Sequence, residues 1–247
     1  MNLLFTDKTG TITKGKLEVV EFMLGNGKKY IDVSSLSNRY QKIFKDSLVY
    51  NNESTYNADE HKIIGGNLTD QAILSYVHLK RRSSVSILKE VRFTSEKKYS
   101  YVDVIDDKKK YRYVKGAPEV LLKYTNRYLD EEGFKKLLFQ QENILKKVND
   151  LTKKGIRVLA VCYGENFSSE LRDLILVGFL LIKDDIREEA YEGVRLIQHA
   201  GVQTVMITGD NLGTASSIAR EAGILDDEKV ILSSSELSSL SDSEVEK

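Results

Sequence analysis

The sequence predicts an α/β fold in two domains, one of them inserted into the other. From residue 188 to 232 helical patterns alternate with short apolar strands, which is typical of a parallel, doubly wound sheet. From 85 to 114 the chain is rich in β-forming residues, so we expect a separate α+β domain built on an antiparallel sheet. Because the first strand opens the chain, the parallel domain is expected to combine both chain ends.

Composition sets the class of protein. A chain of 247 residues with 41% hydrophobic and 30% charged residues is long enough for two globular domains, although one large domain is not excluded. Lys plus Arg equals Asp plus Glu, 37 of each, which indicates no nucleic-acid partner. The only cysteine, Cys162, cannot form an intramolecular disulfide. The apolar run 174–182 is far shorter than the roughly 20 residues of a membrane helix, and no signal peptide opens the chain, so its character is cytosolic.

The first third of the chain is expected to alternate strands, helices and a loop. Apolar residues predict strands at 3–5 and 17–23, and a helical period runs through 34–50. The polar segment 51–60 is expected to be a mobile loop. Thr69 is a suitable N-cap for a helix that continues to Leu79.

The middle of the chain contains the β-rich part and a long helix. Three strands are predicted at 85–93, 99–105 and 110–114, with a hairpin turn at Asp106-Asp107. Pro118 suits the first turn of a helix through Tyr124. An amphipathic pattern predicts a helix over 131–153, with Gly155 as its C-cap.

The last third alternates regularly. The predicted elements are strands at 156–163, 174–182, 202–207 and 230–232, and helices at 188–199 and 212–222. The strand 174–182 is almost wholly apolar and is therefore expected to be central in its sheet.

The segment Asp7 to Thr13, with the sequence DKTGTIT, follows the first strand. A carboxylate at the carboxyl end of a strand can act as a nucleophile on phosphorus and carry the phosphoryl group as an acyl phosphate. Lys8 would offset the negative charge, and Gly10 would let the backbone close around phosphate oxygens. A polar turn is the plainer reading of an isolated Asp-Lys pair.

Two further strand-to-helix junctions are suited to phosphate. Thr208 and Gly209 follow the strand 202–207, where ligands of open α/β sheets bind, although such a junction alone is more often structural. Lys115 and Gly116 precede a helix whose N-terminus favours anions. Phe93 ends a strand and could stack on a base, although an isolated phenylalanine there is more often part of a core.

Together these segments resemble P-type cation-transporting ATPases of the haloacid dehalogenase-like superfamily. The segment 7–13 resembles the phosphorylation signature, 93–99 the adenine-binding stretch, 115–119 the nucleotide-site lysine segment and 206–211 the phosphate-binding threonine segment. Segments 66–70 and 155–160 resemble further nucleotide contacts. Segment 184–187 resembles the hinge, but Asp185 stands where the family usually has proline, which puts the stiffness of the hinge in doubt.

The resemblance implies a fold and a set of roles. Residues 1–16 and 183–247 would form a Rossmann-like phosphorylation domain, incomplete at its C-terminal end, and 17–182 an inserted nucleotide-binding domain. The implied ligands are ATP and Mg²⁺, the latter bound by Asp7 and Thr9. The implied catalytic residues are Asp7, Lys8, Thr9 and Thr208, and the implied nucleotide contacts are Asp70, Phe93, Ser95, Lys98, Lys115, Gly116, Arg157, Asp184, Arg187, Gly209 and Asp210.

The resemblance also sets expectations about the whole protein. The membrane helices, the actuator domain and a second Mg²⁺-binding aspartate of the family are missing from this sequence. We therefore expect a soluble, monomeric fragment from the cytoplasmic face of a membrane pump for a hard cation such as Ca²⁺. Alone, it is expected to bind ATP weakly and to form little phosphoenzyme.

Two alternatives stay open. A soluble phosphatase of the same superfamily would carry a second aspartate two residues after the nucleophile, where this chain has Thr9. A nucleotide-binding module without catalysis is the alternative from another class.

Overall fold

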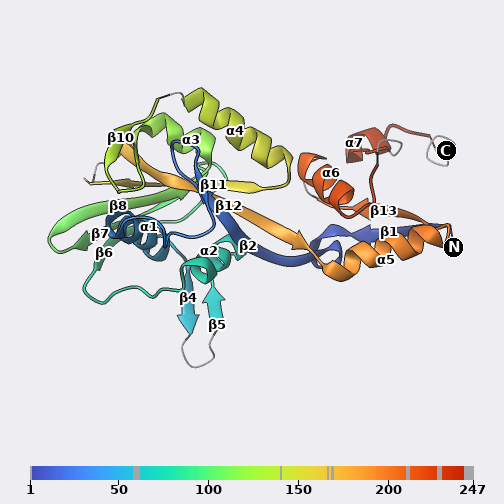
Figure 1. Cartoon of the computed structure of the whole chain (residues 1–247), viewed down its shortest axis with the longest axis horizontal. Coiled ribbons are helices and arrows are strands. Elements are labelled where there is room, and N and C mark those ends of the chain that lie inside the picture. The colour runs from blue at the N-terminus through green and yellow to red at the C-terminus, as the bar shows by residue number, and fades with distance from the viewer. Residues whose placement is uncertain are drawn as a thin grey trace. The chain divides into compact units, whose positions relative to one another are not determined.

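The chain divides into two compact units. The computed structural model describes residues 2–57, 62–139, 141–165, 167, 170–209, 212–226 and 230–241. The end unit comprises Met1–Gly15, Lys153–Gly155 and Asp184–Lys247, and the middle unit comprises Lys16–Thr152 and Ile156–Lys183 (Figure 1).

A large, mainly antiparallel sheet forms the centre of the middle unit. Its main path runs β10-β9-β12-β11-β8-β7-β6, and β2 pairs with both β12 and β3. All neighbours on the main path are antiparallel except β9 and β12, which are parallel. The strands are β2 (Thr13–Met23), β3 (Lys29–Tyr30), β6 (Ser86–Val91), β7 (Tyr99–Asp106), β8 (Lys109–Gly116), β9 (Thr125–Leu129), β10 (Lys135–Leu137), β11 (Arg157–Gly164) and β12 (Leu174–Ile186).

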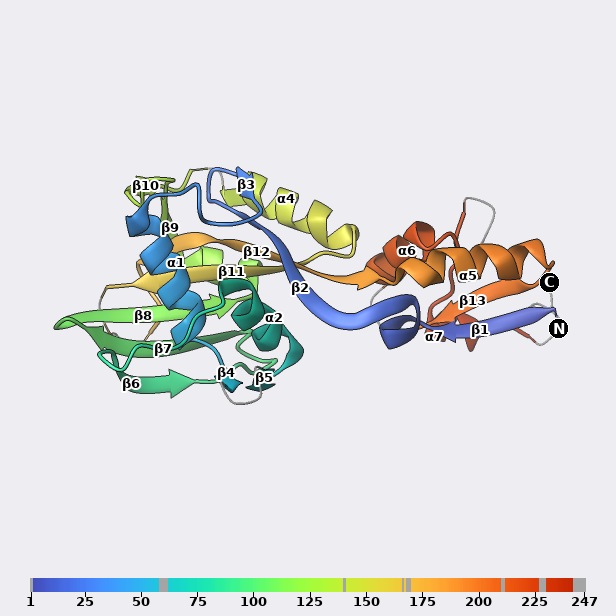
Figure 2. The same cartoon turned by 60° about the horizontal axis from the view of Figure 1, so that its bottom comes forward.

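Helices cover both faces of this sheet. Tyr40, Phe44 and Leu48 of α1 (Asn38–Tyr50) and Ile73 of α2 (Leu68–Val77) pack into one buried cluster. Residues of α3 (Pro118–Leu121), the following turn η2 (Leu122–Tyr124) and α4 (Gln141–Lys153) pack into a second cluster. Strand β12 supplies Val177 to the first cluster and Leu176 to the second, because successive side chains of a strand point to opposite faces. Figure 2 shows α1 and α2 in front of the strands.

A short hairpin adjoins this arrangement. Strand β4 (Ser54–Asn57) pairs antiparallel with β5 (Lys62–Gly65), from Ser54 opposite Gly65 to Asn57 opposite Lys62. The hairpin leads into α2 through Gly66 and Asn67.

The end unit contains a parallel pair of strands. β1 (Leu3–Asp7) pairs with β13 (Gln203–Ile207), and the turn η1 (Lys8–Ile12) follows β1. Ile12 and Ile186 form its buried core with residues of α5 (Glu188–His199), α6 (Leu212–Glu221) and the segment 222–225. A short helix, α7 (Ser234–Leu237), follows.

Several expected elements are confirmed. The helix 188–199 has the predicted bounds, and Pro118 occupies the first position of α3. Gly155 has a φ of 75°, and the Ile156 N–H donates to the Leu151 carbonyl at 3.2 Å, which is the geometry of a glycine-ended helix. The strand from Leu174 is buried between β9 and β11.

The predicted helix over 131–153 is wrong in its first half. Residues 125–129 and 135–137 form the antiparallel strands β9 and β10, and only Gln141–Lys153 is helical. The Asp130 carboxylate accepts hydrogen bonds from the N–H groups of Glu132 and Phe134, and Gly133 has a φ of 77°. This Asp-to-Gly turn outweighs the helical periodicity of the side chains.

Other boundaries differ for local reasons. The side chain of Asn67, not that of Thr69, caps α2 by accepting from the Asp70 N–H at 3.0 Å, and the helix ends at Val77. The N-cap Ser37 delays the start of α1 to Asn38. The β7–β8 turn consists of Asp107 and Lys108, one position later than predicted, and both residues have a positive φ, as in a two-residue hairpin turn.

Two predictions near the loops are also wrong. Part of the expected loop 51–60 is strand β4, while 58–61 lies outside the described residues. Residues 230–232 form no strand, and Val230 is 79% exposed. Within the described part of the end unit the parallel sheet has two strands, β1 and β13.

Two further features concern the whole chain. Cys162 is fully buried in β11, with the Thr125 hydroxyl 3.8 Å from its sulfur. Within the described residues, no helix combines the length and the apolar character needed to cross a membrane.

Candidate functional site

The first candidate cluster lies in the end unit, at the carboxyl ends of its parallel strands. Asp7 is opposite Ile207 in the register, so Lys8 and Thr208 begin the two adjacent loops. The Asp7 carboxylate is exposed, whereas Lys8 is only 7% exposed. The chain thus brings a solvent-accessible carboxylate next to a threonine that is 201 positions away in sequence.

Arg187 fixes the turn that follows Asp7. Its Nη2 donates to the Gly10 carbonyl at 2.9 Å, and its Nε donates to the Thr13 carbonyl at 3.1 Å. Its backbone N–H donates to the Ile12 carbonyl at 3.0 Å. Gly10 has a φ of 78°, a conformation that favours glycine, so the turn depends on this residue as well. Arg187, expected to contact the nucleotide, holds the loop in this structure.

Thr13 links the same turn to Asp184. The Thr13 hydroxyl is fully buried and lies 2.7 Å from Asp184 Oδ2 and 3.1 Å from the Lys8 carbonyl oxygen. The other carboxylate oxygen, Asp184 Oδ1, is buried without a hydrogen-bond partner within the described part of the chain. Thr13 was not among the expected site residues, although it ends the motif that predicted Asp7.

The second candidate cluster lies in the middle unit around the first turn of α2. The Lys115 ammonium donates to the Asp70 carboxylate, and these side chains are 9% and 3% exposed. Asp70 Oδ2 also accepts from the Glu53 N–H at 3.1 Å. Burial lowers the pKa of Lys115, although the Asp70 carboxylate opposes this effect. The two residues are 45 positions apart in sequence, and the fold joins them in one buried ion pair.

Arg157 lies beside this pair. Its Nη1 donates to the Thr69 hydroxyl at 2.8 Å, one residue before Asp70 in α2. Arg157 is the first residue of β11 and is exposed to solvent. An exposed guanidinium of this kind can bind a phosphate or carboxylate group.

Gly116 and Lys98 lie close together at the end of the β7–β8 ladder, next to Lys115. Gly116 is opposite Tyr99 in the β7–β8 ladder, and a side-chain carbon on Gly116 would lie only 2.5 Å from the Lys98 carbonyl oxygen. Glycine is therefore required for this close approach. Lys98 has a φ of 58°, and its Nζ donates to Glu119 at 3.4 Å.

Phe93 and Ser95 lie in the loop between β6 and β7. Phe93 is 53% exposed, so it is not part of the core, and Ser95 is exposed as well. The end of β6 pairs with the start of β7, where Val91 is opposite Tyr101. At the same end of the neighbouring β7–β8 ladder, Ser100 is opposite Lys115. The exposed ring and the cationic residues therefore lie at one end of the sheet.

This arrangement suits a ligand with a flat apolar part and an anionic part. An exposed aromatic ring can stack on a planar group, while Lys98 and Arg157 offer positive charge to anions. Gly209 is exposed directly after Thr208 in the end unit. Asp210 lies outside the described residues.

Among the residues that the structure describes, no group of three or more histidine, cysteine, aspartate or glutamate side chains could hold a metal ion. Mg²⁺ commonly binds through one or two carboxylates together with substrate phosphates and waters, so an exposed Asp7 fits it without such a group.

Comparison with known proteins identifies the family. Residues 39–189, more than half of the chain, match the family described as P-type ATPase, cytoplasmic domain N. The chain therefore belongs to this family. The mixed α/β architecture with a large antiparallel sheet agrees with that assignment.

Individual relatives support the same family. The chain is 29% identical over 259 residues to calcium-transporting ATPase 1 of Lactococcus lactis subsp. lactis (strain IL1403), covering 99% of this chain and 29% of the relative. It is 34% identical over 248 residues to calcium-transporting ATPase 8, plasma membrane-type, of Arabidopsis thaliana, covering 89% of this chain and 23% of the relative. The chain thus spans less than a third of the length of these curated relatives.

Proposed function

We propose that this chain is the ATP-binding and aspartyl-phosphorylated region of a cation-transporting P-type ATPase, with Ca²⁺ as the transported ion. The observation that carries the proposal is the parallel register of β1 and β13, which brings Asp7 and Thr208 to adjacent strand ends. The names of the relatives, which are calcium-transporting ATPases, support the choice of ion.

In this proposal each unit has its own task. Residues 1–16 and 183–247 form a haloacid dehalogenase-like phosphorylation domain, and 17–182 form the inserted nucleotide-binding domain. The transport activity belongs to a longer protein that supplies membrane-spanning and actuator domains. This region would work as a monomeric module at the cytoplasmic face of the membrane.

The proposed reaction is transfer of the γ-phosphoryl group of ATP to Asp7. An Asp7 carboxylate oxygen forms a bond to the γ-phosphorus while the bond to the β–γ bridging oxygen breaks, and ADP leaves with that electron pair. Lys8 offsets the charge on the phosphoryl oxygens, and the Thr208 hydroxyl and the Gly209 and Asp210 segment orient them. Thr9 offers no carboxylate as a base for a hydrolytic water, which favours a long-lived acyl phosphate.

Mg²⁺ would be bound by the Asp7 carboxylate and by Thr9. When bound, it would neutralise the oxygens of the transferring phosphoryl group. Arg187 and Asp184 would act indirectly, by holding the turn that follows Asp7 and contains Thr9. Both contact Thr13 at the end of that turn through hydrogen bonds, and Arg187 also contacts Gly10 within it.

ATP itself would bind first at the middle unit. Phe93 would stack on the adenine, Lys98 and Ser95 would line the same loop, and Gly116 would allow close backbone approach. Asp70, Lys115 and Arg157 would form the charged side of this site. The exposure of Phe93 supports its role as a stacking surface.

Beryllofluoride, a tetrahedral mimic of a phosphoryl group on a carboxylate, tests the phosphorylation site. In ¹⁵N-labelled chain, beryllofluoride with Mg²⁺ should shift the amide signals of residues 7–11 and 208–209, and Asp7→Asn should abolish these shifts. The Asp185→Asn variant is the control, because Asp185 contacts Lys14 outside the turn. Shifts that persist in Asp7→Asn would rule out Asp7 as the acceptor.

Enzyme assays separate the alternatives. Rapid turnover of p-nitrophenyl phosphate without ATP binding would favour a soluble phosphatase, and ATP binding without a beryllofluoride response would favour a nucleotide-binding module. A hydroxylamine-sensitive label from γ-labelled ATP that is lost in Asp7→Asn would support the proposed reaction.

A further inference from the structure

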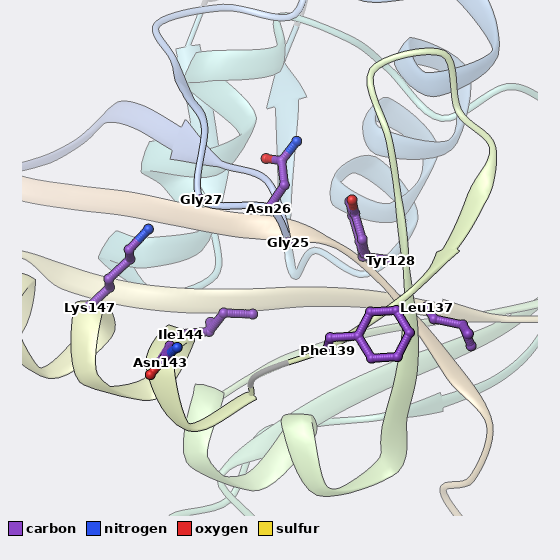
Figure 3. A pocket seen from close by; sticks show the side chains of 9 residues that line it. All are labelled: Gly25, Asn26, Gly27, Tyr128, Leu137, Phe139, Asn143, Ile144 and Lys147. Carbon is purple, nitrogen blue, oxygen red and sulfur yellow. The ribbon is translucent and has the colours of Figure 1, made fainter.

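A second site lies at the opposite edge of the middle unit's sheet from β6. A cavity of about 220 Å³ opens between the turn 25–27, strands β9 and β10 and helix α4 (Figure 3). β10 and β9 occupy one end of the strand order, whereas β6, β7 and β8, which form part of the proposed nucleotide site, occupy the other. None of the proposed nucleotide or phosphorylation residues lines this cavity.

One side of the cavity is apolar and open to solvent. Phe139 is 73% exposed and Leu137 is 57% exposed, and Figure 3 shows these two side chains together at one end of the cavity. Ile144, only 7% exposed, also lines it. Solvent-exposed apolar side chains gathered around a concavity are typical of binding sites.

The other side of the cavity carries an uncompensated positive charge. The Lys147 ammonium lies over the turn at Gly27, because a side-chain carbon on Gly27 would be 2.6 Å from its Nζ. Within the described part of the chain, Lys147 has neither an ion pair nor a hydrogen bond. Figure 3 shows Lys147 at the end of the cavity away from Phe139 and Leu137.

The carboxylate of Glu131, which is hydrogen-bonded to this turn through Asn26, is already occupied. Glu131 Oε1 accepts from Lys28 Nζ at 2.6 Å, from Tyr30 at 3.3 Å and from Asn26 Nδ2 at 3.4 Å. Glu131 therefore balances the charge of Lys28, and Lys147 remains available for a ligand anion.

We propose that this cavity binds a small aromatic monocarboxylate, with its ring against Phe139 and Leu137 and its carboxylate on Lys147. The volume lies below the roughly 300–1,000 Å³ of pockets for drug-sized ligands, so the ligand has one or two rings. A single cation matches a single negative charge, whereas a phosphate dianion would call for further donors.

The test compares 2-naphthoate with its neutral analogue 2-naphthamide by titration of ¹⁵N-labelled chain. Both ligands share the ring system and differ in charge. We expect amide shifts confined to residues 25–27, 128, 137–139 and 143–147, and about threefold tighter binding of the carboxylate, the scale of a partly exposed ion pair. This preference should weaken at high salt.

Three variants make the test specific. In Lys147→Gln the two ligands should bind equally, whereas Lys146→Gln, the adjacent lysine that does not line the cavity, should keep the threefold preference. Phe139→Ser should weaken both ligands together. An unchanged preference in Lys147→Gln, or shifts outside the named segments, would overturn the proposal.

Discussion

The buried ion pair between Lys115 and Asp70 bears both on the stability of the middle unit and on ligand binding. Both side chains are almost fully buried, and the ammonium is held by a carboxylate that also accepts a hydrogen bond from the backbone N–H of Glu53. Desolvation of two charges offsets much of their attraction, so such a pair stabilises a fold mainly when both members are present. A ligand anion that takes the place of Asp70 beside Lys115 would meet an ammonium group that the fold already holds in position.

Removal of one member of this pair should therefore be costly. Lys115→Met leaves the Asp70 carboxylate buried without its cation, and we expect the free energy of unfolding to fall by about 3–5 kcal/mol. The double variant Asp70→Asn with Lys115→Met should recover a large part of this loss. Urea unfolding followed by circular dichroism measures both. Lys16→Ala, which breaks the exposed pair with Glu18, is the control and should change stability by about 0–1 kcal/mol.

Phe93 should matter for ATP binding and hardly for folding. Because its ring is 53% exposed, Phe93→Ala should leave stability nearly unchanged while costing about 1–3 kcal/mol of ATP affinity, the scale of base stacking. Phe134 has the same exposure but lies in the β9–β10 turn, so Phe134→Ala is a matched control. Calorimetric titration that gives equal ATP affinity for both variants would remove Phe93 from the site.

Among whole elements, α2 is the one that positions most of the charged site. Its first turn carries Asp70, and Thr69 in the same turn accepts a hydrogen bond from Arg157. The turn is held by Asn67, whose side chain accepts from the Asp70 N–H. The orientation of the whole cluster thus depends on one capping residue outside the helix.

Loss of this cap should be measurable. Asn67→Ala should lower the free energy of unfolding by about 1 kcal/mol, because an alanine cannot accept from the first-turn N–H. Thr69→Ala should have a smaller effect, since Thr69 is not the cap. Thermal unfolding of both variants decides between the two residues, and a larger loss for Thr69→Ala would contradict the structure.

Elements differ in how well the sequence predicts them. The helix 188–199 is predicted to the residue because a glycine with a positive φ, Gly201, lies two positions after its last residue. The helix expected from 131 fails because residues 130–133 form a turn and residues 135–137 pair with β9 as strand β10. β9 is itself held by β12, a partner 45 or more positions away. Only the folded chain shows which of two compatible local patterns gains tertiary contacts.

The candidate site shows the same division. Local motifs indicate Asp7, Lys115 and Thr208 because each follows a strand and precedes a turn or helix. They cannot show that Lys115 is buried on Asp70, or that Thr13 bonds to Asp184, because burial and pairing depend on distant parts of the chain. The cavity at Lys147 has no sequence signal, since its walls come from four separate segments.

At the scale of the molecule, each unit has its own core. Two buried clusters consist of residues between 22 and 182, and a third combines Ile12 with residues from 186 to 225. The middle unit is nearly continuous in sequence, and its first and last strands, β2 and β12, pair with each other. Its ends therefore lie close together within one sheet.

The middle unit should fold alone. A polypeptide of residues 16–183 contains both of its buried clusters, so it should unfold cooperatively and bind ATP with the affinity of the full chain. Superposition of its ¹⁵N spectrum on that of the full chain tests this directly. Broad, collapsed amide signals from 16–183 would show that the middle unit depends on the end unit.

The buried thiol of Cys162 can report on transient separation of β11 from its neighbouring strands. Burial raises the pKa of this thiol to about 12, so at neutral pH almost no thiolate is present and none is accessible to reagents in the native state. Reaction with Ellman's reagent should therefore proceed only through molecules in which β11 has separated from its neighbours. The rate of this reaction would measure how often β11 separates, without any added label. A cysteine introduced at an exposed position could carry a fluorophore, because the native thiol would not compete for the reagent.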